Sequence, residues 1–554
     1  MTENTTGASA VLDSAHTGDI EGAFGTIRQG DVAPRNRTSM RLKTLLAVIG
    51  PGLIVMVGDN DAGAFGTYTQ AGQDYGTRML WTLLLLVPVI YVNQEMVLRL
   101  GAVTGVGHAR LILERYGKFW GAFSVIDLFL LNALTIVTEF IGISLGLTYL
   151  GLPKVPGVFA AALIVIASVS TGSFRRFERV SMVLVAGSLT LIPIFIAVHP
   201  PAGQLLHDFM VPGMPGGSEL STVMLLIIAI VGTTVAPWQL FFQQSYLIDK
   251  RITPRFIRYE RVDLWIGIVI VVLGAGAMMA FSSAAFAGTA GEGNFTDALG
   301  IAQGLGAVAG KWAGVLFAIA LIDASIIGAA AVGLSTSYAL GDVLGLHHSL
   351  HRRPSEAKGF YAVFAGLLVL SAVIVVIPGS PLGLLTEGVQ TLAGVLLPSA
   401  TVFLLLLCND RAVLGPWVNG RGKNIFSAVI IAVLVMLSTV LTASVLFPAI
   451  TSAQIIAIFI AGAVLALIAA AYLAWAGYRH KRKAPARPQE QEPEQEPEPE
   501  PEPDRATWRM PPVAMLSKPV MSAGTKTGLT VLRGYLLVAS ALVVIKVVQL
   551  ALGH

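Results

Sequence analysis

The chain is poor in cysteine and in charged residues. Among 554 residues there is one cysteine, Cys408, so no internal disulfide bond can form. Charged residues make up 13% of the composition, against roughly 25% in a typical soluble domain. The sequence also lacks a Gly-x-x-x-x-Gly-Lys loop for nucleotide phosphates, which argues against an ATP-driven pump. We therefore expect no soluble enzyme, no cofactor and no nucleic-acid partner.

Hydrophobic residues are abundant instead, at 54% of the chain. They gather in long windows that do not alternate with polar residues, and a bilayer-spanning helix needs about 20 apolar residues. Twelve helices are predicted near 44–70, 77–98, 121–150, 156–172, 180–198, 221–247, 262–287, 308–340, 359–378, 384–408, 425–447 and 453–478, with a thirteenth near 528–550. The sequence therefore predicts an all-α, multi-pass protein of the lipid bilayer.

The positions of lysine and arginine orient these helices. With the amino terminus inside, the cytoplasmic segments of the first twelve helices hold 28 cations and the opposite loops only three, Arg78, Lys154 and Lys311. Cytoplasmic loops carry an excess of such cations. Residues 1–40 lack an apolar h-region, so we expect no signal peptide. The pattern predicts a cell-membrane protein with a cytoplasmic amino terminus and an outside carboxyl terminus.

Four regions follow from this pattern. Residues 1–43 are a polar cytoplasmic segment, and 44–478 are the core of twelve transmembrane helices. Residues 479–527 form a Pro/Glu-rich cytoplasmic linker, in which eight acids between Pro488 and Asp504 predict an extended, solvated chain. Residues 528–552 are an accessory thirteenth helix.

The first helix is interrupted by polar residues near mid-membrane depth. The segment Gly58-Asp59-Asn60-Asp61-Ala62-Gly63-Ala64 places two acids where a charged side chain costs roughly 2.5–3.5 kcal/mol on insertion scales. Such a segment leaves backbone groups unpaired unless it lines a cavity. Asp61, with Asp59 and Asn60 beside it, is therefore the strongest candidate for binding an ion.

The sixth helix has a matching interruption at Thr233-Thr234-Val235-Ala236-Pro237-Trp238. Pro237 has no amide hydrogen, which frees the carbonyl of Thr233 as a possible ligand, and the carbonyls of Val235 and Ala236 are further candidates. Interrupted helices in corresponding positions of two oppositely oriented halves are typical of inverted-repeat transporters. We therefore predict a LeuT-like 5+5 inverted repeat with two further helices and an extra carboxyl-terminal helix.

At these two interruptions the chain resembles the Nramp family of divalent-metal transporters. The resemblance rests on Gly50-Pro51-Gly52 through Asp61-Ala62-Gly63-Ala64, on Gln70-Ala71-Gly72, on Glu139-Phe140-Ile141-Gly142, on Gly232 through Pro237, and on Gln390 followed by Pro398. It covers about residues 45–478 and implies that Asp61 and Gln390 are metal ligands. The metal is then the substrate of the protein.

Two departures from the family pattern bear on the ion. The family's Asp-Pro-Gly-Asn becomes Asp61-Ala62-Gly63-Ala64, and its Met-Pro-His becomes Ala236-Pro237-Trp238. Losing the thioether removes a preference for soft transition metals, whereas carboxylate, carbonyl and water suit Mg²⁺ and Mn²⁺. The chain is most similar to the Nramp-related magnesium-transporter branch, with Asn60 or Asp59 as possible substitutes for the missing asparagine.

Proton coupling is predicted to be weak or absent. Positions associated with proton movement in the family read Trp238, Gln243, Ile136 and Glu139, so only the glutamate remains. Indole and amide groups do not titrate near neutral pH. Asp323 in the eighth helix is a further candidate for gating, and Glu95 with Arg99 is expected to form an ordinary ion pair.

The sequence thus favours a secondary transporter that imports a divalent cation, Mg²⁺ or Mn²⁺ before softer metals. Two alternatives stay open: a LeuT-like transporter of an organic solute, and a non-transporting membrane sensor or partner protein with a vestigial site. The oligomeric state does not follow from the sequence.

Overall fold

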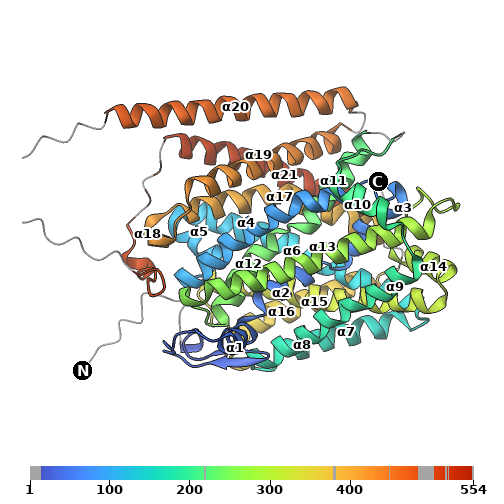
Figure 1. Ribbon diagram of the computed structural model, residues 1–554, viewed down its shortest axis with the longest axis horizontal. Coiled ribbons are helices and arrows are strands. Elements are labelled where there is room, and N and C mark those ends of the chain that lie inside the picture. Colours follow the sequence, from blue (N-terminus) through green and yellow to red (C-terminus); the bar gives the residue numbers. More distant parts are fainter. Residues whose placement is uncertain are drawn as a thin grey trace, which may run out of the picture.

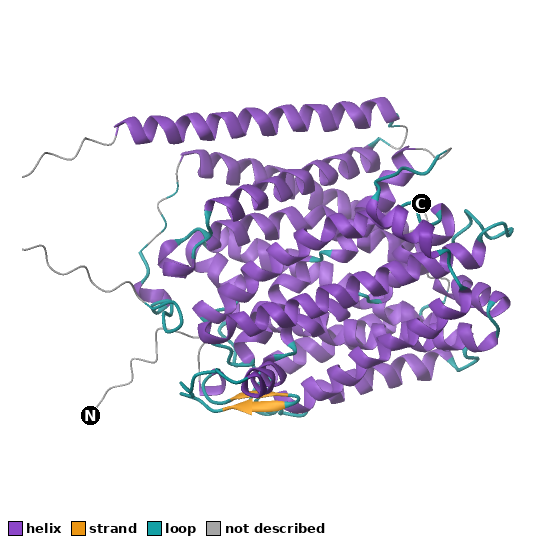
Figure 2. Ribbon diagram, in the orientation of Figure 1, coloured by secondary structure: helices purple, strands orange, loops and turns teal. Residues whose placement is uncertain are grey.

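The chain forms a bundle of long helices that run roughly along one axis, with a two-stranded hairpin at one end (Figures 1 and 2). The computed structural model describes residues 14–216, 220–378, 382–447, 450–483 and 504–551, apart from residues 518, 520 and 522. A helix or a broken helix occupies each of the thirteen predicted windows. The all-α prediction is confirmed for the bundle.

The first half of the bundle begins with a helix in two pieces, α2 (Pro51–Gly58) and α3 (Ala62–Tyr75), which follows α1 (Thr38–Val48). The remaining helices of this half are α4 (Leu80–Thr104), α5 (His108–Tyr116), α6 (Lys118–Tyr149), α7 (Lys154–Val169), α8 (Phe174–Gly187), η3 (Ser188–Thr190), α9 (Leu191–Val198) and α10 (Ala202–Met210).

The second half also begins with a helix in two pieces, α11 (Leu220–Thr234) and α12 (Pro237–Asp249). It continues with η4 (Pro254–Phe256), α13 (Ile257–Phe286), α14 (Ala298–Val308), α15 (Lys311–Leu344), α16 (Lys358–Val376), α17 (Leu382–Cys408), α18 (Arg411–Leu414) and η5 (Gly415–Trp417). Each half therefore opens with an interrupted helix, as the inverted-repeat prediction requires.

Within the described residues, eight helices are long and apolar enough to cross a membrane, or up to ten if each of two bent pairs counts as one span. Some predicted spans are shorter than this criterion: α3 has 14 residues and α7 has 16. The prediction of twelve core crossings therefore stays a prediction.

The last three helices are α19 (Arg421–Leu446), α20 (Ser452–Lys483) and α21 (Ala523–Ala551). α20 lies along the outer edge of the bundle (Figure 1). α21 packs more deeply: Leu536 is fully buried, the Tyr535 hydroxyl is hydrogen-bonded to Ser438 of α19, and the Arg533 guanidinium lies 3.8 Å from the ring centroid of Phe119. The thirteenth helix thus belongs to the packed body of the protein.

The acidic run from 488 to 503 lies outside the described residues, but the chain after it is docked rather than extended. Residues 504–517 include η6 (Val513–Met515). The Met510 amide donates to the Val103 carbonyl at 3.2 Å, and Arg115 donates to the Ser517 carbonyl at 2.5 Å. The prediction of an extended, solvated chain concerns Pro488 to Asp504, nearly all of which lies outside the described residues, so it stays a prediction. The chain after Asp504 docks because its backbone groups find partners on the bundle.

The amino-terminal segment is also structured from residue 14 onward. It forms η2 (Ser14–His16) and an antiparallel hairpin of β1 (Ile20–Gly22) and β2 (Gly25–Ile27), with Ile20 opposite Ile27. Arg251, just after α12, donates to the carbonyls of Ala15 at 3.0 Å and Asp19 at 3.1 Å. The hairpin thereby covers the end of the bundle at which α12 ends.

A buried ion pair lies beneath this hairpin. Lys250 and Glu178 have fully buried side chains, with 2.6 Å between Nζ and Oε1. The Lys250 ammonium also donates to the carbonyls of Val48 at 2.6 Å and Ile49 at 2.8 Å, where α1 gives way to α2. Gly50 has φ +151°, and a Cβ there would lie 2.2 Å from the Glu178 carboxylate. The pair and the glycine together fix the bend before α2.

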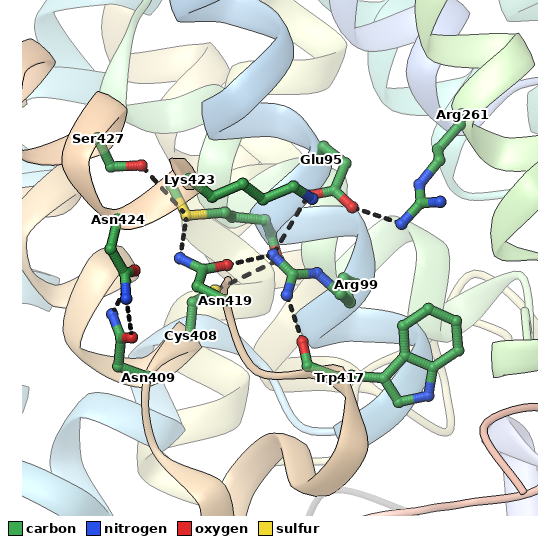
Figure 3. Close-up of polar contacts among 11 residues, drawn as sticks. Glu95, Arg99, Arg261, Cys408, Asn409, Trp417, Asn419, Lys423, Asn424 and Ser427 are labelled. Carbon is green, nitrogen blue, oxygen red and sulfur yellow. Dashed lines mark hydrogen bonds and ion pairs between the residues drawn. The ribbon is translucent and has the colours of Figure 1, made fainter. Parts of the chain in front are cut away.

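A second charged cluster joins three helices at the same end (Figure 3). The Glu95 carboxylate on α4 contacts Arg99 at 3.2 Å, Arg261 of α13 at 2.7 Å and Lys423 of α19 at 2.7 Å. Arg99 also donates to Asn419 at 2.6 Å. The predicted Glu95–Arg99 pair is therefore confirmed and is part of a larger network.

Replacing Glu178 with alanine is expected to lower the free energy of unfolding by about 3–5 kcal/mol, because it removes the carboxylate that is hydrogen-bonded to the buried Lys250 ammonium. The matched control is Glu114→Ala, which breaks a part-exposed pair with Arg110 and should cost less than about 1 kcal/mol. Thermal unfolding of the purified protein in detergent measures both. Equal losses in the two variants would contradict the structural role of the buried pair.

Candidate functional site

The interruption of the first span is a three-residue segment between α2 and α3. Asp59, Asn60 and Asp61 are 1%, 5% and 4% exposed, although none carries an apolar side chain. Asp61 has an extended backbone (φ −77°, ψ −173°), and its Oδ1 accepts a hydrogen bond of 2.9 Å from the Ala64 amide. Asp61 therefore acts as the amino-terminal cap of α3, which explains why a helix restarts directly after it.

The interruption of the sixth span is the dipeptide Val235-Ala236 between α11 and α12. α12 begins at Pro237, which needs no amide partner at the first helical position. The Thr233 hydroxyl is buried and has no hydrogen-bond partner within the described residues. The Ala236 carbonyl accepts from the Gln239 amide at 3.2 Å. The break thus leaves polar groups of Thr233 and of the backbone in the protein interior.

Polar side chains join the two interruptions. The Tyr68 hydroxyl on α3 lies 2.7 Å from the Thr234 hydroxyl on α11. The side-chain amide of Gln239 on α12 donates to Asp59 Oδ1. The side-chain amide of Gln94 on α4 donates in turn to Gln239 Oε1 at 2.9 Å. The two breaks, about 175 residues apart in sequence, therefore lie together in space.

A third helix brings Glu139 to the same place. Its Oε2 on α6 accepts a hydrogen bond of 3.2 Å from the amide of Ala62, the residue directly after Asp61. A Cβ added to Gly328 of α15 would lie 2.8 Å from the Glu139 carboxyl carbon, so this glycine makes the room that Glu139 occupies. Glu139 is thus a direct neighbour of Asp61.

Trp238 lies on the opposite side of the segment from α3. Its indole is 1% exposed, and its Cη2 lies 3.7 Å from where a Cβ on Gly58 would stand. Phe242 and Tyr246 continue a column of rings along α12, with centroids 6.2 Å and then 5.1 Å apart. This column leads from the candidate site to the end of the bundle that the hairpin covers, and it fills that route with aromatic side chains.

A cavity of about 150 Å³ approaches the site from the other end. Its polar lining includes Thr67 and Gln70 of α3, Thr138 of α6 and Asp297, the amino-terminal cap of α14. The cavity reaches Ala62, the residue after Asp61. The candidate site is therefore approached by a polar vestibule on one side and closed by rings on the other.

Several oxygen atoms at the site remain free within the described residues. They include Asp59 Oδ2, Asn60 Oδ1 and Glu139 Oε1, and both amide atoms of the buried Gln243 are also without partners. In the part of the chain that the structure describes, no three or more His, Cys, Asp or Glu side chains are arranged so that they could hold a metal ion by themselves. The donor set is therefore two to three carboxylates supplemented by neutral oxygens, which suits a hard cation that keeps some of its water.

The remaining predicted residues divide into three groups. Ala64 contributes its amide to the Asp61 cap and has no side-chain ligand atom. Gln390 lies in α17, but its side chain is outside the described residues. Asp323 does not join the site, since it lines a separate cavity that it shares with Asn60.

Sequence reasoning missed Gln239, Gln94, Tyr68 and Thr234. All four are buried polar residues in otherwise apolar spans, and that is the signal by which they could have been selected. Their partners lie on other helices, so their roles follow only from the packed structure.

Comparison with known proteins agrees with this architecture. The family model for Nramp, described as natural resistance-associated macrophage protein-like, matches residues 52–444. The divalent metal cation transporter MntH of Ralstonia nicotianae is 29% identical over 396 residues, which cover 68% of this chain and 86% of the relative. Its counterpart from Deinococcus radiodurans is 26% identical over 435 residues, covering 76% and 93%.

A solved structure of a manganese transporter mutant from Eremococcus coleocola has the same fold. Its TM-score is 0.64 at 19% identity, and the match covers 84% of this chain and 98% of that chain. The break between α2 and α3 and the break between α11 and α12 both fall inside the residues that the family model matches. The match begins at the second residue of α2. The chain belongs to the Nramp family.

Proposed function

We propose that this chain is a secondary transporter that imports a divalent cation across the cell membrane. The observation that carries the proposal is the pair of buried carboxylates, Asp59 and Asp61, in the broken first span beside the break at Val235-Ala236. The related MntH proteins are divalent metal cation transporters, and this supports transport rather than enzymatic catalysis. The cation is the substrate, and no cofactor is invoked.

The ligand set favours Mg²⁺ or Mn²⁺ over softer metals. Asp61 and Asp59 supply carboxylates, and Asn60, Thr233, Val235 and Ala236 supply neutral oxygens from side chains or backbone. Ala236 brings no sulfur to the break, and thioether sulfur is what selects softer ions. This choice of ligands is what links the chain to a magnesium-transporting branch of the family.

Alternating access is supported by the unequal closure of the two ends. The polar vestibule reaches Ala62, whereas Trp238, Phe242 and the Glu178–Lys250 pair fill the route to the hairpin end. Release to that side requires α2 and α12 to part at this column. The proposal therefore makes Trp238 the inner barrier beneath Asp59 and Asp61.

Weak or absent proton coupling follows from the groups beside the ion. Trp238 and Gln243 cannot exchange protons near neutral pH, which leaves Glu139, bonded to the Ala62 amide, as the titratable group beside the two proposed ligand carboxylates. Passage is then driven by the ion gradient and by the membrane potential, which is worth about 2.3 kcal/mol per charge per 100 mV.

Asp61→Asn is expected to weaken Mn²⁺ and Mg²⁺ binding at least tenfold, because it removes a negative charge while its amide oxygen can still cap α3. Isothermal titration of the purified protein with each metal and with Ca²⁺ measures this. Asp127→Asn is the matched control, since Asp127 lies on α6 about 18 Å along the helix from Glu139 and should bind metal as the parent does. Unchanged affinity in Asp61→Asn would defeat the site; no metal binding by the parent would favour the organic-solute or sensor alternatives.

Ala236→Met is expected to increase the preference for Cd²⁺ over Mg²⁺ at least tenfold, because it places a soft sulfur at the break. Competition between the two ions for uptake into proteoliposomes measures the ratio. Ala236→Leu has a similar volume without sulfur and serves as the control. A similar shift in both variants would show that cavity volume, rather than ligand softness, sets the selectivity.

Metal uptake is expected to proceed without matching acidification of the vesicle interior. Proteoliposomes loaded with a pH-sensitive dye, and followed in parallel for Mn²⁺ uptake, measure both fluxes. Acidification comparable in size to the metal flux would sink the uncoupled mechanism. Protein-free liposomes at the same ion gradient control for leakage.

A further inference from the structure

A large cavity lies beside the candidate metal site, on the side away from the polar vestibule. Its volume is about 560 Å³, and its walls come from the 59–61 segment, η3, α9, α10, α13 and α15. A cavity of this size is typical of sites for small organic ligands. Neither the proposed cation path nor the family comparison accounts for it.

The cavity opens on the outer surface of the bundle. Four of its lining residues are large, apolar and more than half exposed: Leu189 at 56%, Ile192 at 52%, Leu206 at 62% and Leu273 at 67%. In a membrane-spanning bundle such residues face the hydrocarbon of the bilayer. A ligand dissolved in the lipid can therefore reach the cavity sideways, without entering the vestibule.

Nearly all of the lining is apolar, but three oxygen-bearing side chains interrupt it: Asp323, Asn60 and Ser188, whose hydroxyl donates to the Val185 carbonyl at 2.7 Å. Asp323 projects from α15, and no hydrogen bond or ion pair to its carboxyl is found among the described residues. Its carboxyl lies close against α8, since a Cβ added at Gly187 would stand 2.5 Å from it. An acid in such a place is costly and rarely lacks a function.

Asn60 supplies the second oxygen. It is 5% exposed, and its Nδ2 donates to the Val271 carbonyl at 3.3 Å, which fixes the side chain. Its Oδ1 is buried without a hydrogen-bond partner within the described residues. Asp323 and Asn60 therefore offer the cavity two acceptors without hydrogen-bond partners among the described residues, and none of the lining residues is basic.

These features define the occupant. An acyl chain would fill the apolar walls but would leave both acceptors without donors. A hydrated metal ion would match the acceptors but would find no polar groups on the other walls to replace its water. An amine with an apolar body matches both the acceptors and the apolar walls, because its ammonium group pairs with the carboxylate and its apolar body takes the place of lipid.

We propose that this cavity is a binding site for amphiphilic amines that enter from the bilayer, with Asp323 as the counter-ion and Asn60 Oδ1 as a second acceptor. The site shares Asn60 with the proposed metal site, but neither Asp59 nor Asp61 lines it. The proposal does not rest on cation transport, so it can be tested in the absence of metal.

The test is equilibrium binding of tritium-labelled decylamine to the full chain in lipid nanodiscs, in metal-free buffer, after subtraction of empty nanodiscs. We expect saturable binding that excess unlabelled decylamine displaces and that decanol and decanoate do not. Asp323→Asn should weaken binding at least tenfold, and Asp323→Glu, which keeps the charge, should restore most of it. Asn60→Ala should weaken binding severalfold.

Two further variants test whether decylamine binds in this cavity or at the metal site. Asp61→Asn and Asp127→Asn should bind decylamine as the parent does, because their carboxyl groups do not line the cavity. Equal displacement by decanol would overturn the proposal in favour of a plain lipid groove. A loss in Asp61→Asn with full binding in Asp323→Asn would also overturn it, since the amine would then occupy the metal site. Monodisperse elution of each variant on size exclusion establishes that it is folded.

Discussion

A broken helix inside a membrane must find partners for its backbone within the protein, and this requirement organises the centre of the molecule. The amides at the start of α3 are satisfied by two carboxylates, Asp61 through Ala64 and Glu139 through Ala62. The amino-terminal end of a helix also favours negative charge. Asp61, which caps α3, is therefore also one of the two acids proposed to hold the cation, and this is why the break and the candidate site coincide.

The same requirement governs the bend before α2. Asp263 on α13 accepts hydrogen bonds from the amides of Gly52 at 2.6 Å and Leu53 at 3.3 Å. On the other side of the bend, Lys250 donates to the last carbonyls before α2 and is balanced by Glu178. The Ala23 amide of the hairpin donates to the second oxygen of Glu178. The start of the first span is thus held by α8, α12, α13 and the amino-terminal segment together, and any motion of α2 must disturb a buried charged network.

The segment from Asp59 to Asp61 separates two unlike environments. On one side the route from the vestibule is polar and ends at Ala62, next to Asp61. On the other side Asn60 faces a cavity with largely apolar walls and a single acid. Trp238 closes a third direction by packing against Gly58. A short unwound segment therefore borders a water-accessible path, a lipid-facing cavity and an aromatic barrier, and a change in any of them acts on the same three residues.

The local chemistry of the chain was enough to predict the helices, the two interruptions and the all-α bundle. Apolar windows place helices because they must be buried in lipid, and both Pro237 and the Asp59-Asn60-Asp61 run disfavour a continuous helix locally. The Glu95–Arg99 ion pair could likewise be predicted from the sequence, because its two residues lie one helical turn apart. Properties that depend on neighbours in sequence could be inferred from sequence.

Only the tertiary structure decided which polar groups meet. Gln239 reaches Asp59 across 180 residues of chain, Glu139 reaches Ala62 across 77, and Asp323 turns away from the site towards a different cavity. The position of Lys250 in the sequence places it among the cations of the predicted cytoplasmic segments, yet its side chain is fully buried in the structure. Residues 14–27 and 504–517 looked polar or linker-like, yet both dock on the bundle. Such contacts depend on how whole helices pack against one another, and the pattern of residues along any single helix does not contain that information.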